Sequence, residues 1–118
     1  MSRMQIKRLV RGNAIIVSFD IRTDKFESTS ERIKFFEELY GRNQIIRKQN
    51  KTYEYRRAGI LDEMEHMRVA NSVFIIMREH MRRIEEFFKE WEDKVMMRAF
   101  PVLLDKEEFK LLEPRKKR

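Results

Sequence analysis

The sequence of 118 residues contains no cysteine, only two prolines and three glycines, and no long apolar run. Without cysteine, the chain can form neither disulfides nor thiolate metal sites, and it has no cysteine nucleophile. The scarcity of proline and glycine argues against a disordered or low-complexity chain. The apolar runs are too short to cross a bilayer, and the basic N-terminus leads into no signal-peptide core. We therefore expect a cytoplasmic protein without membrane partners.

Basic residues outnumber acidic ones by 27 to 20, and they are concentrated in three segments. Residues 1–12 carry four bases and no acid, residues 42–57 carry six bases and one acid, and residues 115–118 are all basic. Charge segregated in this way favours a polyanionic partner, most simply nucleic acid. Abundant charge and absent cysteine also suit a thermophilic protein, although the eight methionines count against that interpretation.

The first half of the chain shows patterns of strands and one helix. Residues 4–10 are a candidate strand, and the strict alternation of residues 14–21 predicts a strong one. A helix is expected to begin at the capping box of Ser28 and Glu31 and to end at Gly41. Residues 44–48 and 52–60 are expected to be two strands around a polar turn at 49–51.

The second half is less regular. Residues 61–67 fit either a helical turn or a loop, and residues 68–78 fit a buried central strand, or else a helix beginning at Asn71. An apolar stripe predicts an amphipathic helix over residues 80–95. The last strand is expected over residues 96–104, at an edge or a bulge because of Pro101, followed by a short helix over 106–112 that Asp105 caps. The stripe residues are Met81, Ile84, Phe87, Phe88, Trp91 and Val95.

This order of elements predicts a single α+β domain over residues 1–113, followed by a basic tail over 114–118. We expect a mixed or antiparallel sheet with two main helices on one face and a short C-terminal helix. The nearest standard architecture is the ferredoxin-like plan. The aromatic residues of the second helix are expected to be core, although a dimer face is the alternative.

The segment 42–57 is the main candidate contact surface because it interleaves bases with two tyrosines. Lysine and arginine contact phosphates, and exposed rings stack on unpaired bases, as in RNA recognition. The alternative is that both tyrosines pack inward while the bases form a solvated edge. The terminal bases are further candidates, or else simple solubility features. The candidate nucleic-acid-binding residues are Lys7, Arg8, Arg11, Arg42, Arg47, Lys48, Lys51, Tyr53, Tyr55, Arg56, Arg57, Arg115, Lys116, Lys117 and Arg118.

Few residues suggest catalysis or metal binding. Asp20 ends the strongest predicted strand and, with Asp24 and Glu27, could hold Mg²⁺, although a turn-initiating surface acid is the simpler interpretation. His66 and His80 do not make a zinc site, and His66 fits a polar surface position or a hydrogen-bonded strand end. Neither a nucleophile elbow nor a Gly-rich phosphate loop is present. We therefore expect a non-enzymatic protein without a cofactor.

The stretch Ile15-Ile16-Val17-Ser18-Phe19-Asp20-Ile21, with the following helix, resembles the opening of the small CRISPR-associated ferredoxin-fold nucleases and integration adaptors. Asn71-Ser72-Val73-Phe74 is similar to a later strand of that family. The resemblance implies a homodimer, duplex DNA and Mg²⁺, with Asp20 as the metal ligand. In this chain a basic hairpin and a further segment separate the first helix from that later strand, which the family reaches sooner.

Three functional hypotheses follow from the sequence. The first is a nucleic-acid-binding protein that prefers RNA, in which the hairpin and both basic termini make contacts; a ribosome or another nucleoprotein is one possible partner. The second is a ferredoxin-fold nuclease or DNA-integration adaptor that uses Asp20. The third is an interaction module for an acidic protein.

Overall fold

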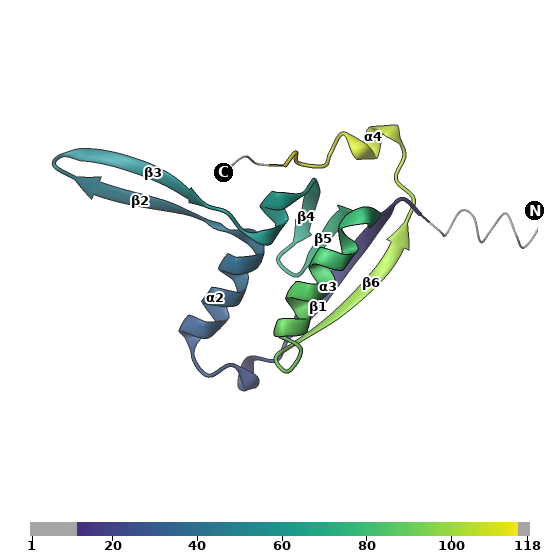
Figure 1. Ribbon diagram of the computed structural model, residues 1–118, viewed down its shortest axis with the longest axis horizontal. Helices are drawn as coiled ribbons and strands as arrows, with labels where there is room; N and C mark the ends of the chain where they lie inside the picture. Colours follow the sequence, from purple (N-terminus) through teal and green to yellow (C-terminus); the bar gives the residue numbers. More distant parts are fainter. Residues whose placement is uncertain (1–11, 116–118) are drawn as a thin grey trace, which may run out of the picture.

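Four antiparallel strands form the main sheet of the computed structural model, which describes residues 12–115 (Figure 1). Their order across the sheet is β4-β5-β1-β6, so β1 lies inside the sheet and β6 at its edge. The expected strand over residues 4–10 lies outside the described residues. The strands are β1 (Ala14–Ile21), β4 (His66–Ala70), β5 (Val73–Met77) and β6 (Val95–Val102).

Two helices, α2 (Thr29–Tyr40) and α3 (Met81–Glu90), pack on one face of this sheet (Figure 1). Through the main sheet the chain runs strand, helix, strand, strand, helix, strand, which corresponds to the ferredoxin-like plan. The predicted α+β class with two main helices is therefore confirmed. A separate two-stranded sheet, β2 (Arg42–Lys48) and β3 (Lys51–Arg57), is inserted between α2 and β4.

The ends of α2 follow the sequence closely. The Ser28 hydroxyl accepts a hydrogen bond from the backbone N–H of Glu31 at 3.1 Å. The Glu31 carboxylate accepts one from the backbone N–H of Glu27 at 2.9 Å, one residue earlier than a standard capping box requires. Gly41 ends the helix with a φ of 76°, a conformation that favours glycine. Both predicted boundaries of this helix are confirmed.

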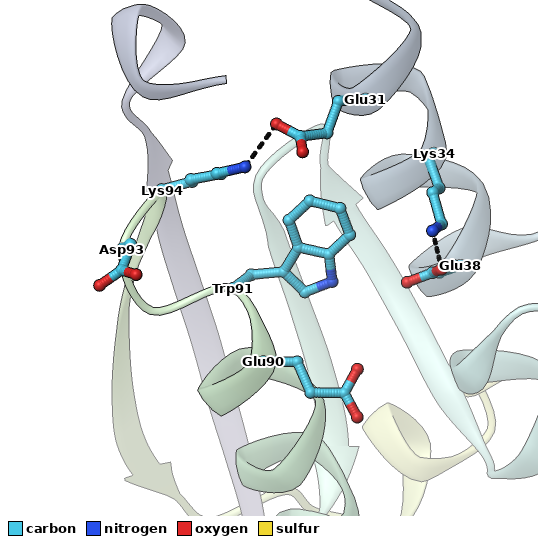
Figure 2. Close-up of a pocket in the computed structure, with 7 residues that line it drawn as sticks. All are labelled: Glu31, Lys34, Glu38, Glu90, Trp91, Asp93 and Lys94. Atoms are coloured by element: carbon cyan, nitrogen blue, oxygen red, sulfur yellow. Dashed lines mark hydrogen bonds and ion pairs between the residues drawn. The ribbon is translucent and has the colours of Figure 1, made fainter. Parts of the chain in front are cut away.

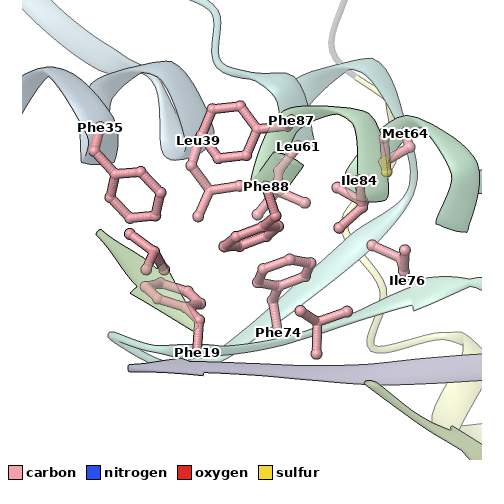
Figure 3. Close-up of a cluster of buried hydrophobic side chains, with 12 residues drawn as sticks. Phe19, Phe35, Leu39, Leu61, Met64, Phe74, Ile76, Ile84, Phe87 and Phe88 are labelled. Carbon is pink, nitrogen blue, oxygen red and sulfur yellow. The ribbon is translucent and has the colours of Figure 1, made fainter. Parts of the chain in front are cut away.

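Aromatic rings from the two helices and the sheet form the core (Figure 3). Phe35 of α2 stacks on Phe87 of α3 with ring centroids 5.5 Å apart, and it meets Phe19 of β1 edge-on at the same distance. Such pairs stabilise a core beyond the area that they bury. Residues of α2, α3, β1 and β5 therefore share one apolar cluster, which holds both helices on the sheet.

The middle of the chain differs from the sequence interpretation. Residues 68–78 were expected to be one strand, but Asn71 and Ser72 form a turn between β4 and β5. The ambiguous stretch before it divides into a short 3₁₀ helix, η2 (Ile60–Glu63), and the start of β4. The prediction of a buried central strand is confirmed for β5, in which Phe74, Ile75 and Ile76 are buried. Two short strands joined by a two-residue turn resemble one longer strand when only apolar residues guide the assignment.

The predicted helix over residues 80–95 is too long. A 3₁₀ turn, η3 (Arg78–His80), precedes α3, which ends at Glu90. The backbone N–H groups of Lys94 and Val95 both bond to the Trp91 carbonyl, closing a turn that leads into β6. Val95 is therefore buried as the first residue of a strand rather than as the last turn of a helix. Pro101 lies in the edge strand β6, as its missing N–H predicts.

The C-terminal segment covers part of the other sheet face. Asp105 caps a short helix, α4 (Lys106–Phe109), through a reciprocal capping box with Glu108, although the helix ends before the predicted residue 112. Leu104 and Leu112 pack with Ala14 and Ile75 in a second apolar cluster. Across residues 12–115, no helix is long and apolar enough to span a membrane.

Candidate nucleic-acid interface

β2 and β3 form a two-stranded arm, residues 42–57, that projects from the rest of the molecule (Figure 1). Facing residue pairs run from Arg42 and Arg57 at the base to Lys48 and Lys51 at the tip. The two turn residues have φ values of 53° and 64°, as expected for the tight turn that matches strand twist. The predicted hairpin is confirmed, but the turn is shorter than expected and β3 ends before residue 60.

The arm buries almost nothing. Every strand residue in it is exposed except Gln44, which is half-buried. Even Ile45 is 61% exposed, and neither apolar cluster includes a residue of the arm. An isolated two-stranded hairpin is marginally stable in water, so contacts at its base must hold this one in place.

Two glycines form that base. A Cβ added to Gly59 would lie 2.2 Å from the backbone nitrogen of Gly41, and one on Gly41 would lie 2.5 Å from the carbonyl oxygen of Arg57. The obstructing atoms are backbone, which cannot move aside as the end of a flexible side chain can. The chain therefore enters and leaves the arm through a crossing that only glycine permits.

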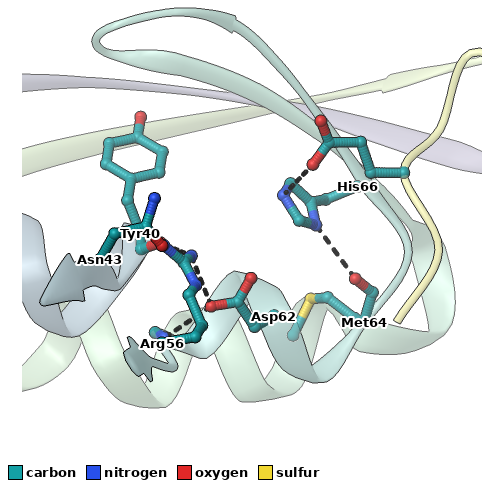
Figure 4. Close-up of polar contacts among 8 residues, drawn as sticks. Tyr40, Asn43, Arg56, Asp62, Met64 and His66 are labelled. Carbon is teal, nitrogen blue, oxygen red and sulfur yellow. Dashed lines mark hydrogen bonds and ion pairs between the residues drawn. The ribbon is translucent and has the colours of Figure 1, made fainter. Parts of the chain in front are cut away.

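Arg56 fastens the arm to this base (Figure 4). Its guanidinium donates to the Asp62 carboxylate at 2.7 Å and to the Tyr40 carbonyl at 2.6 Å. Asp62, whose side chain is 3% exposed, also accepts from the Gly59 N–H at 2.9 Å. Although Arg56 is among the candidate contact residues, its charge is used inside the protein. The sequence interpretation missed Asp62; the signal was its place three residues after Gly59, where a carboxylate can bond back to the chain.

Tyr40, the last residue of α2, connects the arm base to the main sheet. Its hydroxyl donates to the Asn71 carbonyl at 2.7 Å, and the Arg68 guanidinium lies 3.7 Å from the ring centroid. Burial of this side chain raises the pKa of Tyr40 above its usual range, an effect that the nearby positive charge of Arg68 opposes. The helix end from which the arm emerges is thus joined to the β4–β5 turn.

The other arm bases are more available than Arg56. Arg42 makes an exposed ion pair with Glu37 at 3.5 Å, and Arg57 donates to Gln44 within the arm at 2.9 Å. An exposed ion pair contributes little to stability, and the neutral Gln44 amide does not compensate the charge of Arg57. Arg47, Lys48 and Lys51 are exposed and form no ion pair with any residue between 12 and 115. The tip of the arm therefore presents uncompensated positive charge.

The two arm tyrosines face solvent. Tyr53 is 42% exposed and Tyr55 is 49% exposed, and their ring centroids lie 6.5 Å apart with planes at 26°. The sequence left open whether these rings pack inward. The structure shows that neither belongs to the core.

The terminal bases are only partly within the described chain. Arg115 is exposed beyond the residues that pair with the start of β4, where Glu113 and His66 exchange two backbone hydrogen bonds. The remaining terminal candidates, Lys7, Arg8, Arg11, Lys116, Lys117 and Arg118, lie outside the described residues.

The predicted acids and histidines do not form a centre. Asp20 is exposed on β1 opposite Met96, and the described residues contain no group of three or more Asp, Glu, His or Cys side chains that could hold a metal. His66 is a buried strand-end residue with its Nδ1 atom 3.1 Å from the Met64 carbonyl, one of the two positions expected for it (Figure 4). His80 lies 3.7 Å from the exposed Glu79.

A shallow pocket of about 340 Å³ lies between α2 and the turn after α3 (Figure 2). The hydrogen bond from Lys94 at 2.6 Å, helped by the Glu27 N–H, lowers the pKa of Glu31. Acids outnumber bases around the pocket, so it is a poor site for a polyanion. The residues that line it are Glu31, Lys34, Glu38, Glu90, Trp91, Asp93 and Lys94.

No protein-family model, curated protein or solved structure matches this chain. The resemblance to CRISPR-associated ferredoxin-fold proteins therefore stays a prediction. The candidate site rests on the geometry and charge of the arm.

Proposed function

We propose that this protein is a non-enzymatic nucleic-acid-binding protein that prefers RNA and contacts it through the arm. One observation carries the proposal: no residue between 42 and 57 is fully buried, and the segment carries six bases and one acid. A segment that adds nothing to the core needs another reason for its composition. Phosphate binding supplies that reason, because it requires exposed lysine and arginine on a surface that can approach the backbone.

The shape of the arm supports the same proposal. A β-ribbon can enter a groove or lie along a strand, and this one spans six residue steps from Lys51 to Arg57, about 20 Å at the rise of a β-strand. The projection separates its charge from the acidic pocket between α2 and α3 (Figures 1 and 2). Screening at physiological salt limits repulsion between separated patches, so the arm can attract a polyanion locally.

The test is a binding titration by fluorescence anisotropy, with labelled RNA and duplex DNA, across a salt series. Replacing both tip lysines, Lys48 and Lys51, with alanine should weaken RNA binding and lower the slope of log affinity against log salt by roughly 1.5. The charge-matched control replaces Lys89 of α3 and Lys106 of α4, which are exposed on other elements. Equal effects of both double variants would remove the arm as the interface, and binding of an acidic protein but no nucleic acid would favour the interaction-module hypothesis.

A further inference from the structure

The arm has two chemically different faces. Directly facing residues of paired strands point to the same side, and neighbours along a strand alternate. On one side, here called the tyrosine face, lie four basic residues, two tyrosines and no acid. The opposite face has two basic residues, one acid, one isoleucine and two small polar residues. The tyrosine face comprises Arg42, Gln44, Ile46, Lys48, Lys51, Tyr53, Tyr55 and Arg57, and the opposite face comprises Asn43, Ile45, Arg47, Thr52, Glu54 and Arg56.

Charge and rings alternate in blocks along the tyrosine face. Lys48 and Lys51 face each other at the tip, Arg42 and Arg57 face each other at the base, and both tyrosines lie between these pairs. The two rings are exposed and 6.5 Å apart with similar orientation. Each ring can therefore stack on a separate nucleobase, while the lysine pair and the arginine pair contact phosphates on either side.

The opposite face is less suited to this role. Arg56 is held at the arm root by Asp62 and the Tyr40 carbonyl, contacts here called the clamp. Arg47 is therefore the one basic residue of the opposite face that lies outside the clamp. Glu54 on the same face repels phosphate. The clamp therefore fixes the arm through one face and leaves the other available.

Rings can stack only on bases whose flat surfaces are open. In a duplex, neighbouring base pairs cover those surfaces, and a protein reaches phosphates and groove edges instead. We infer that the tyrosine face binds unpaired nucleobases, in a single strand or a loop. Tyr53 and Tyr55 stack on the nucleobases, and the flanking lysines and arginines contact phosphates. This inference rests on the proposed function and names the class of nucleic acid that the arm takes.

The experiment compares one labelled oligonucleotide as single-stranded RNA, as the same strand paired to its complement, and as single-stranded DNA. The wild-type protein should bind both single strands more tightly than the duplex, because every base has a ring surface. Tyr53→Ala combined with Tyr55→Ala should weaken single-strand binding by at least about 30-fold and change duplex binding much less. Tyr53→Phe with Tyr55→Phe keeps the rings and should bind like the wild type.

The matched control, Ile45→Ala with Thr52→Ala, changes two exposed, uncharged residues on the opposite face and should leave all affinities unchanged. If the wild type binds nucleic acid, but the protein with both Tyr53→Ala and Tyr55→Ala binds single strands as tightly as the wild type does, the inference is overturned while the proposed function stands. If the wild type binds none of the three oligonucleotides at any salt concentration, both fail. All four substituted side chains are exposed and lie on the arm, so circular dichroism should show unchanged folding.

Discussion

The main sheet and the arm are both antiparallel, yet the chain uses them differently. In the main sheet, β1 and β5 present Val17, Phe74 and Ile76 to the helices, and these side chains are fully buried. In the arm, the largest apolar side chains, Ile45, Tyr53 and Tyr55, are all exposed. Burial of apolar area is what stabilises a fold, so the main sheet holds the molecule together and the arm does not.

The comparison also shows where rigidity comes from when burial is absent. The sequence has three glycines, and two of them form the crossing at the arm base. Beside that crossing, the buried Asp62 holds Arg56. The arm is thus positioned by backbone fit and by the pairing of Arg56 with a buried carboxylate at its root, which leaves its length free to display charge and rings.

The largest expected effect is on stability of the body. Phe35→Ala should lower the free energy of unfolding by about 3–5 kcal/mol, because Phe35 is fully buried among other rings. Tyr55→Ala, the loss of an aromatic ring from the arm, should change it by less than about 0.5 kcal/mol. Urea denaturation of both variants measures the contrast, and similar losses would show that the arm tyrosine is part of the stabilising structure.

The next effect tests the arm base. Gly59→Ala should destabilise the protein by about 1–3 kcal/mol, because the new methyl group meets backbone atoms of residues 39–41. Ala58→Ser, a small change at the exposed neighbouring position, is the control and should be neutral. An unchanged unfolding midpoint for Gly59→Ala would mean that the backbone at the crossing can move aside for a Cβ atom.

Two adjacent arginines should separate positioning from binding. Arg56→Ala should cost about 1–3 kcal/mol of stability, because it removes the guanidinium that donates a charge-assisted hydrogen bond to the buried Asp62 carboxylate. Arg57→Ala should leave stability nearly unchanged and lower the salt slope of RNA binding by about one. Denaturation and anisotropy on the same two proteins check both. If both variants lose the same stability and the same RNA affinity, the distinction between a positioning arginine and a binding arginine is wrong.

A smaller effect concerns pH. The hydrogen bond from Lys94 lowers the pKa of Glu31 in the folded state. The ionised Glu31 therefore stabilises the fold above its unfolded-state pKa, and this contribution is lost as the pH falls through its folded-state pKa. Glu31→Gln should therefore be less stable than the wild type near neutral pH, and the difference should shrink below about pH 4. Glu90→Gln removes a carboxylate from the same pocket and serves as the control. A difference that grows with acid would contradict this assignment.

Local patterns in the sequence predicted much of the fold. Alternation predicted β1, the Ser28 cap and Gly41 bounded α2, and the polar turn placed the arm hairpin. Boundaries failed where two elements met without glycine or proline, at Asn71–Ser72 and at the α3–β6 junction. Apolar residues stand on both sides of each short polar junction, so each pair of elements fits the pattern of one longer element.

The candidate site was only partly predictable. Charge arithmetic located the arm, since six bases against one acid are visible in the sequence. The exposure of Tyr53 and Tyr55 depends on whether anything packs on the hairpin, which is a tertiary property. The pairing of Arg56 with Asp62 likewise depends on a crossing between Gly41 and Gly59, residues that are separated by the whole arm.

The most direct test of the account shortens the arm. Residues 45–54 are replaced by an Asn-Gly turn that joins Gln44 to Tyr55. This facing pair has the same hydrogen-bonding phase as Lys48 and Lys51, which close the native turn, and Arg56 and both glycines remain. We expect a free energy of unfolding within about 0.5 kcal/mol of the wild type and a large loss of RNA affinity, with the salt slope lower by roughly two or more. A shortened protein that still binds RNA with the wild-type affinity and slope would contradict the central claim that the arm is the interface.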